Sequence, residues 1–389
     1  MSPFVLLCIT GFLAIFSSTI SKNPVLPLFA THLGADPSGV GMVAAVSAFS
    51  GMIASIPAGM LSDRWGRKKM LMTASAVFAT APFLYLFVSN LWQLAGVRFL
   101  HGFATAFFIP VSMALISDLF QRERGELMGW FSTATLLGRF TAPVAGGTLL
   151  GLLAASPDFS YRAVYMVCSL AGGATFFAVL RIPDIYKETV HHQNWTETLT
   201  AFTCVVSNRA ILVTASVEAA VLFAYGIFET FLPLYARQHG ISAYEIGIFL
   251  SAQIIVLALA RPIMGRFSDR HGRKAQIVSG AVTSAGILAA LALFSTFVSF
   301  LIISVLFGLS LSLVTSATTA HIADLSKKET HGSAMGLLGS VMDIGHTTGP
   351  LAAGLIAAHF GFAQAFLAAS SALFLASLLF LMIIGPSRN

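Results

Sequence analysis

The sequence contains Gly59-Met60-Leu61-Ser62-Asp63-Arg64-Trp65-Gly66-Arg67-Lys68 and, 206 residues later, the related stretch Gly265-Arg266-Phe267-Ser268-Asp269-Arg270-His271-Gly272-Arg273-Lys274. Further pairs keep this spacing or exceed it by one residue: Pro27 and Pro233, Gly41 and Gly247, Asp118 and Asp324, Gly138 and Gly345, Pro143 and Pro350, Gly147 and Gly354. One spacing held over most of a 389-residue chain predicts two related halves.

Composition places both halves in a lipid bilayer. Hydrophobic residues make up 56% of the chain and charged residues only 10%, whereas a soluble domain carries about 25% charged residues. Soluble, disordered, collagen-like and disulfide-stapled classes are therefore excluded. The three cysteines (Cys8, Cys168 and Cys204) stand singly, so we expect no metal site. The net charge of +6 is spread between apolar runs, and no nucleic-acid partner is expected.

Twelve apolar runs reach the length of about 20 residues that a membrane-spanning helix needs. They are 4–30, 39–61, 70–89, 91–117, 126–154, 161–181, 210–235, 244–267, 275–295, 297–323, 332–358 and 361–384. The only long polar stretch separates the first six from the last six. We therefore predict an all-α membrane protein with a six-helix bundle at 1–182, a linker at 183–209 and a second bundle at 210–389. Because six spans separate the copies, the halves should be related by a pseudo-twofold axis along the membrane normal.

The placement of Lys and Arg predicts the orientation. Sixteen of the 22 fall in loops on the side of the N-terminus, and only Arg162 and Arg237 fall in loops on the other side. The positive-inside rule then puts both termini and the linker in the cytoplasm. The first run lacks a basic start and a cleavage site before Lys22, which indicates a retained span. We expect a multi-pass protein of the plasma membrane, of the bacterial inner-membrane type.

The repeated loop resembles motif A of the major facilitator superfamily, and the twelve-span pattern resembles that family along the whole chain. In the family this loop latches the cytoplasmic side closed. The resemblance assigns gate roles to one set in each half: Gly59, Asp63, Arg64, Gly66 and Arg67, and then Gly265, Asp269, Arg270 and Arg273. Alternatively, the basic residues only satisfy the positive-inside rule. That rule does not require Gly and Asp at fixed spacing.

Span 4 carries Arg98-x-x-x-Gly102-x-x-x-Ala106, which resembles the family's motif B. The family links this arginine to proton transfer. An arginine exposed to lipid costs at least about 3 kcal/mol, so Arg98 should face a cavity or a partner. The alternative is an arginine near the outer surface whose side chain snorkels to water.

Spans 5 and 11 carry Gly-Pro motifs that resemble motif C of the drug:proton antiporter branch. The hinge candidates are Gly138, Pro143, Gly147, Gly349 and Pro350. Ala142 stands where the motif has a glycine before the proline. Small residues beside a proline allow close packing and bending, which suits a hinge. The motif favours export, although glycine-rich spans also serve simple packing.

Four ionisable residues in spans 7 and 11 complete the proton-coupling candidates with Arg98: Glu218, Glu229, Asp343 and His346. Burial in a low-dielectric site favours the protonated, neutral form of a carboxyl group, so such acids can carry protons. Asp343 and His346 are three residues apart on one helix and can share a proton. Alternatively, each acid neutralises an arginine and fixes packing.

The family resemblance places spans 1, 4, 7 and 10 around a central cavity. The substrate-cavity candidates are Lys22, Arg139, Tyr225 and Phe228. The N-terminal half lacks the acid that many antiporters of this branch carry in span 1 or 4. Its wall is cationic and the C-terminal wall anionic, so we expect the two walls to be complementary.

The resemblance implies a proton-coupled exporter (antiporter) of small amphipathic molecules, of the multidrug type, that works by alternating access. A proton symporter or exchanger for a sugar or organic anion is the alternative; the cationic wall favours it and motif C opposes it. A transporter-derived sensor that does not cycle is a third reading, opposed by gate motifs in both halves. We expect no enzyme activity and no cofactor beyond an ion gradient. The expected partners are a small-molecule substrate and the bilayer, and the expected functional state is a monomer.

Overall fold

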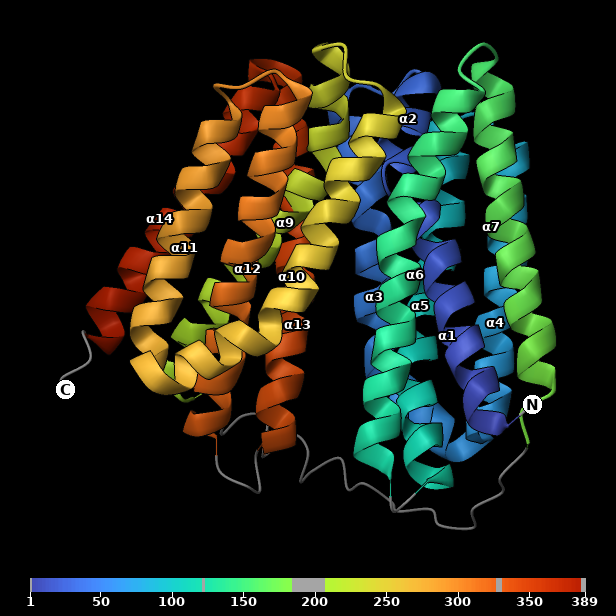
Figure 1. Cartoon of the computed structure of the whole chain (residues 1–389), viewed down its shortest axis with the longest axis horizontal. Helices are drawn as coiled ribbons and strands as arrows, with labels where there is room; N and C mark the ends of the chain where they lie inside the picture. The colour runs from blue at the N-terminus through green and yellow to red at the C-terminus, as the bar shows by residue number, and fades with distance from the viewer. Residues whose placement is uncertain (1, 121–122, 184–206, 327–330, 386–389) are drawn as a thin grey trace. The chain divides into compact units, whose positions relative to one another are not determined.

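The computed structural model describes residues 2–120, 123–183, 207–326 and 331–385, and within these ranges the side chains at 55–64 and 332 lie outside the description. The described part is helical and contains no strand. Figure 1 shows its long helices running roughly alongside one another within each part of the chain.

The helices fall into two compact units. The N-terminal unit contains α1 (Pro3–Ile20), α2 (Val25–His32), α3 (Pro37–Trp65), α4 (Arg67–Leu84), the short 3₁₀ helix η1 (Tyr85–Phe87), α5 (Leu91–Leu119), α6 (Arg124–Leu152) and α7 (Pro157–Leu180). The C-terminal unit contains most of α9 (Arg209–Gln238) and α10 (Ala243–His271), with α11 (Arg273–Leu291), α12 (Phe297–Leu325), α13 (His331–Phe360) and α14 (Phe362–Ile384). The segment Ala236–Ser251 groups with the N-terminal unit.

Each of the twelve predicted spans overlaps a helix, and the bounds agree to within a few residues. Among the described residues, ten helices are long and apolar enough to cross a membrane; α6 and α13, which carry the Gly-Pro motifs, are not among these ten. The predicted linker at 183–209 falls almost wholly outside the described residues. The division into domains at 182 and 209 therefore stays a prediction.

The first predicted span lies within one candidate membrane span, Pro3–His32, which is made of two helices. Helix α1 ends at Ile20 and α2 begins at Val25. Pro24 has no backbone N–H to donate, so a helix cannot continue through it with its ladder intact. Lys22 consequently lies in the break and is half-buried there.

The packing scheme inside the N-terminal unit returns inside the C-terminal unit. Helix α4 packs on α5 and α7, and α11 packs correspondingly on α12 and α14. Helix α6 touches α7, as α13 touches α14. The internal repeat of the sequence is thus a repeat of helix contacts.

Candidate functional site

Helices α9 and α13 cross almost backbone to backbone in the C-terminal unit. A Cβ atom placed on Gly345 would overlap the carbonyl oxygen of Ala219, and one on Gly349 would overlap that of Phe223. Both overlaps are with backbone atoms, so only glycine fits these positions without a shift of the helices. Inside a bilayer such small-residue contacts bring two helices together.

This crossing brings an acid and an imidazole together. His346 Nε2 lies 3.1 Å from Glu229 Oε2. Gly226, one turn before Glu229, leaves room for the ring, since a Cβ there would lie 3.2 Å from His346 Cδ2. The Tyr225 ring lies beside the imidazole, with centroids 5.8 Å apart. Glu229 is buried, whereas 23% of the His346 side chain is exposed. Glu229 is therefore enclosed by protein, whereas part of the His346 ring reaches the surface.

Asp343 does not share this arrangement. His346 contacts Glu229 on the neighbouring helix, and no hydrogen bond joins it to Asp343 among the described residues. The main-chain oxygen of Asp343 accepts the Thr347 hydroxyl at 2.7 Å, which is an ordinary turn contact within α13. The proton sharing predicted between Asp343 and His346 stays a prediction, and in the structure the imidazole contacts Glu229 of α9.

Glu218 lies three turns before Glu229 on α9 and is 1% exposed. Thr318 of α12 donates its hydroxyl to Glu218 Oε2 at 2.5 Å. The other carboxyl oxygen, Oε1, has no hydrogen-bond partner within the described ranges. Thr318 was not among the residues predicted from the sequence. The internal repeat is the feature that could have identified it, because the repeat places another hydroxyl residue, Ser112, at the equivalent position in α5.

Phe228 and Arg139 lie in different environments. Phe228 is fully buried against Phe307, with ring centroids 4.6 Å apart, so it is part of the packing of the C-terminal unit. Arg139 is exposed on α6. In the repeat register, Arg139 takes the position that His346 has in α13. The two halves therefore carry different nitrogen-containing side chains at equivalent places, a guanidinium and an imidazole.

Arg98 is buried inside the N-terminal unit and is 3% exposed. Its Nη1 donates to the Tyr85 hydroxyl at 3.4 Å, and the same hydroxyl lies 3.4 Å from Nδ1 of His101. One turn later, Gly102 lets α5 approach α3, where a Cβ would collide with Ser50. The expectation that Arg98 has a partner is met by a tyrosine.

The Gly-Pro motif of α6 also forms a close helix contact. A Cβ on Gly138 would lie 3.0 Å from the Phe16 nitrogen in α1, and one on Gly147 would lie 3.1 Å from Gly247 Cα. Gly138 thus lets α6 approach α1, and Gly147 lets it approach the start of α10. Pro143 and Pro350 both lie inside helices that continue past them.

The two candidate gate loops form matching ion pairs. Arg67 Nε lies 3.3 Å from Asp118 Oδ2, and Arg273 Nε lies 2.8 Å from Asp324 Oδ2. Arg273 also reaches Asp269 at 2.6 Å. Both pairs join residues 51 apart in the chain. This shared separation of 51 residues is the sequence feature that could have identified Asp118 and Asp324 as the partners of Arg67 and Arg273.

The other gate candidates are placed only in part. Gly66 and Gly272 make the turns between helices at positive φ, 91° and 89°, which glycine adopts without strain. Gly265 and Arg270 lie near the end of α10, and Arg270 is exposed. The side chains at 55–64 lie outside the description, so the gate roles predicted for Gly59, Asp63 and Arg64 stay predictions.

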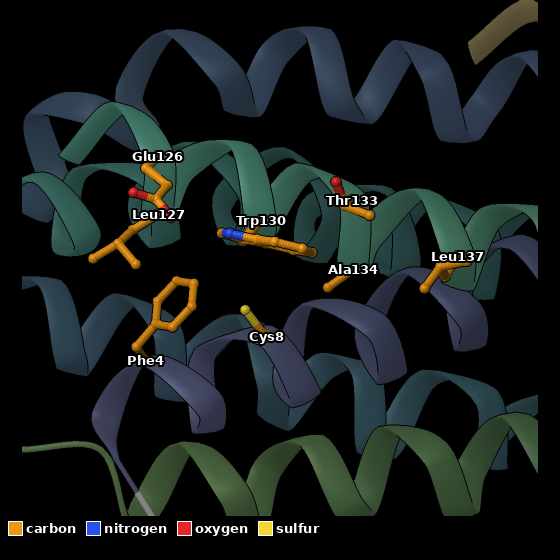
Figure 2. Close-up of a pocket in the computed structure, with 8 residues that line it drawn as sticks. All are labelled: Phe4, Cys8, Glu126, Leu127, Trp130, Thr133, Ala134 and Leu137. Atoms are coloured by element: carbon orange, nitrogen blue, oxygen red, sulfur yellow. The ribbon is translucent and has the colours of Figure 1, made fainter. Parts of the chain in front are cut away.

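A separate shallow pocket of about 360 Å³ lies between α1 and α6. Figure 2 shows Phe4 and Cys8 on one side of it, facing Trp130 on the other, with Glu126 at one end. None of the predicted cavity residues lines it.

Comparison with known proteins extends these observations. A family model described as Major Facilitator Superfamily matches residues 7–256 and 217–389. Multidrug resistance protein MdtG of Salmonella paratyphi C is 28% identical over 88% of this chain and 86% of its own length. Multidrug resistance protein 2 of Bacillus subtilis is 24% identical over 86% of this chain and 83% of its own.

Solved structures agree in fold. A bacterial homologue of the human lysosomal transporter Spinster aligns with a TM-score of 0.83 at 15% identity, covering 98% of this chain and 96% of its own. The nucleoside transporter NupG aligns with a TM-score of 0.81 at 15% identity over 100% of both chains.

Proposed function

Because the chain belongs to the Major Facilitator Superfamily, a family of membrane transporters, we propose that it is a proton-coupled exporter of small amphipathic molecules. Two relatives that match most of its length carry the name multidrug resistance protein. The Gly-Pro motifs of α6 and α13 also support export as opposed to import. The proposal requires no cofactor, only a proton gradient, and places the chain in the inner membrane with both termini in the cytoplasm.

The observation that carries the proposal is the contact between Glu229 and His346 across α9 and α13. Without an added proton, the pair has one net negative charge. A proton on the imidazole gives a neutral ion pair, which costs less to hold in a low-dielectric environment than a lone carboxylate does. Loading and unloading this proton changes the charge of the C-terminal unit, and such a change can bias a conformational equilibrium.

Glu218 is the second proposed proton carrier. The Thr318 hydroxyl donates to the carboxylate, and after protonation of the carboxyl group the same hydroxyl can accept a hydrogen bond. The site therefore serves both protonation states without rearrangement of the helices. Asp343 and Arg98 remain further candidates for coupling, and Lys22, Arg139 and Tyr225 remain candidates for contact with substrate.

The experiment uses purified protein in proteoliposomes with an imposed pH gradient and three probes: a lipophilic cation, a neutral amphiphile and an organic anion. We expect transport of the first or second probe against the direction of proton flow. Glu229→Gln should abolish the response to the gradient. Glu123→Gln, an exposed acid at the start of α6, is the matched control and should behave as the unchanged protein.

Two results would contradict the proposal. Transport of the organic anion alone, in the same direction as protons, would favour the symporter alternative. A Glu229→Gln protein that still responds fully to the pH gradient would remove the proposed site from coupling.

A further inference from the structure

The pocket between α1 and α6 (Figure 2) has the size of a small-ligand site. Its volume of about 360 Å³ falls within the roughly 300–1,000 Å³ that ligand pockets occupy. Helix α1 contributes Phe4 and Cys8, which are four residues apart and so share one helix face. Helix α6 contributes a longer stripe that runs from Glu126 to Leu137. All the lining residues belong to the N-terminal unit.

Two aromatic rings on facing helices give the pocket apolar walls. Phe4 is held from behind by Phe120, whose ring it meets edge-on with centroids 6.1 Å apart. Trp130 is 59% exposed, so most of its indole remains free for contact with an occupant. Two small side chains, Cys8 and Ala134, line the space between the helices. This arrangement suits a flat apolar molecule, because aromatic rings pack well against other flat rings.

One end of the pocket carries a negative charge. Glu126 is the only acid that lines it, and no basic residue lines it. Arg124, the nearest basic residue along the chain, is exposed and does not line the pocket. Among the described residues, no basic side chain forms an ion pair with Glu126. A helix start favours an acid, but this preference does not explain an acid placed beside two aromatic rings.

We propose that this pocket binds a flat amphipathic cation, with its rings between Phe4 and Trp130 and its charged group beside Glu126. The carboxylate attracts the charge, and the negative ring faces add to this attraction. An anion would be repelled. A zwitterionic phospholipid would bring a phosphate beside the same carboxylate, where no lining residue can neutralise it. Because none of the predicted cavity residues lines the pocket, it is an additional binding site that the proposed export function does not require.

The test follows alkylation of Cys8 by N-ethylmaleimide in the purified full-length protein, with peptide mass spectrometry to separate Cys8 from the other two cysteines. The probes are 9-aminoacridine, a cation at neutral pH, and acridine-9-carboxylate, an anion with the same rings. We expect 9-aminoacridine to slow the alkylation of Cys8 at least fivefold in a saturable way, and the anion to leave the rate unchanged. Cys168 is buried on α7 and does not line the pocket, so its rate should respond to neither probe.

Two substitutions of Glu126 test the charge. Glu126→Gln should raise the concentration of 9-aminoacridine that gives half-maximal protection at least tenfold. Glu126→Lys should reverse the preference, so that the anion protects Cys8 and the cation does not, which a purely structural role of Glu126 would not produce. Glu123→Gln removes an exposed acid that does not line the pocket, and it should behave as the unchanged protein.

The measurement on the unchanged protein depends neither on a variant that folds nor on a pH gradient. Equal protection by the two acridines, or protection by neither, would overturn the proposal even for a protein that exports amphipathic molecules. Protection by added phosphatidylethanolamine but not by 9-aminoacridine would assign the pocket to a lipid and would also overturn it. Protection by 9-aminoacridine alone, in a protein without gradient-driven transport, would support the binding site and reject only the proposed function.

Discussion

His346 on α13 and Glu229 on α9 are 117 residues apart in sequence, yet Nε2 of one lies 3.1 Å from Oε2 of the other. Their contact depends on glycines that carry no charge themselves. Gly345 and Gly349 remove the side chains that would hold the two helices apart. A motif that the sequence marked as a hinge thus also builds the proposed proton site.

The first prediction concerns this crossing. Gly349→Val should push α13 away from Phe223 and break the contact between Glu229 and His346. Overpacking of a close contact costs about 1–3 kcal/mol, so we expect a lower Tm and loss of gradient-driven transport. Gly339→Val, on the same helix at a position with no atom within 4 Å of an added Cβ, is the control and should change neither. Equal effects of the two substitutions would contradict the account.

The second prediction concerns the hydrogen bond from Thr318 to Glu218. Thr318→Val keeps the shape of the side chain and removes the donor, leaving a buried carboxyl group without it. We expect at least a fivefold lower rate of gradient-driven transport, since a lost hydrogen bond to a charged group costs about 1.5–3 kcal/mol. Thr318→Ser should restore most of the rate. Thr319→Val is the neighbouring control, because within the described ranges the one hydrogen bond of the Thr319 hydroxyl goes to Thr315 O, at 2.7 Å.

The third prediction concerns the gate pairs. Arg67→Asp and Asp118→Arg should each slow transport, because each replaces the ion pair, with its 3.3 Å contact, by two like charges on facing side chains. The double exchange should recover at least half of the lost rate. Stability should change little, since partly exposed ion pairs contribute about 0–1 kcal/mol. A double variant as slow as either single variant would show that the pair itself is not used.

The fourth prediction concerns a loop outside the spans. Asp36 caps α3, and hydrogen bonds from the Ser38 hydroxyl and the Gly39 N–H lower the pKa of its carboxyl group. The folded state then binds its proton less readily than the unfolded state does. The cap therefore stabilises the fold above the ordinary aspartate pKa of about 3.9, and its contribution disappears as pH falls through the lowered pKa.

Asp36→Ala should lower Tm at neutral pH, because loss of a cap costs about 1 kcal/mol. The difference from the unchanged protein should shrink below about pH 4. A difference that stays constant down to pH 3 would contradict the assigned cause.

Helix positions could be predicted because each span is a long apolar run with polar ends. The run at 91–117 appears as Leu91–Leu119, where Asn90 caps the helix start by accepting from Gln93 N. The break at Lys22 was harder to predict, because the same prolines are compatible with a kink in one helix. Sequence alone could not tell these apart.

The candidate site was predicted less completely than the helices. Glu229 and His346 stood out as charged residues inside spans, but their pairing depends on which helices are neighbours and on ring direction. Asp343 was the nearer partner along the chain, whereas the contact that the structure shows is with Glu229. The sequence could not tell whether Phe228 lines a cavity or packs against Phe307, because an aromatic residue at that helix position is compatible with either.

The most direct test of the central claim is a measurement of proton movement driven by substrate. Proteoliposomes that contain a pH-sensitive dye start with equal pH on both sides and receive an outward or inward gradient of a transported probe. The account predicts proton flow opposite to the probe, and none with Glu229→Gln although the probe still equilibrates. Substrate movement through the unchanged protein without any proton movement would contradict it.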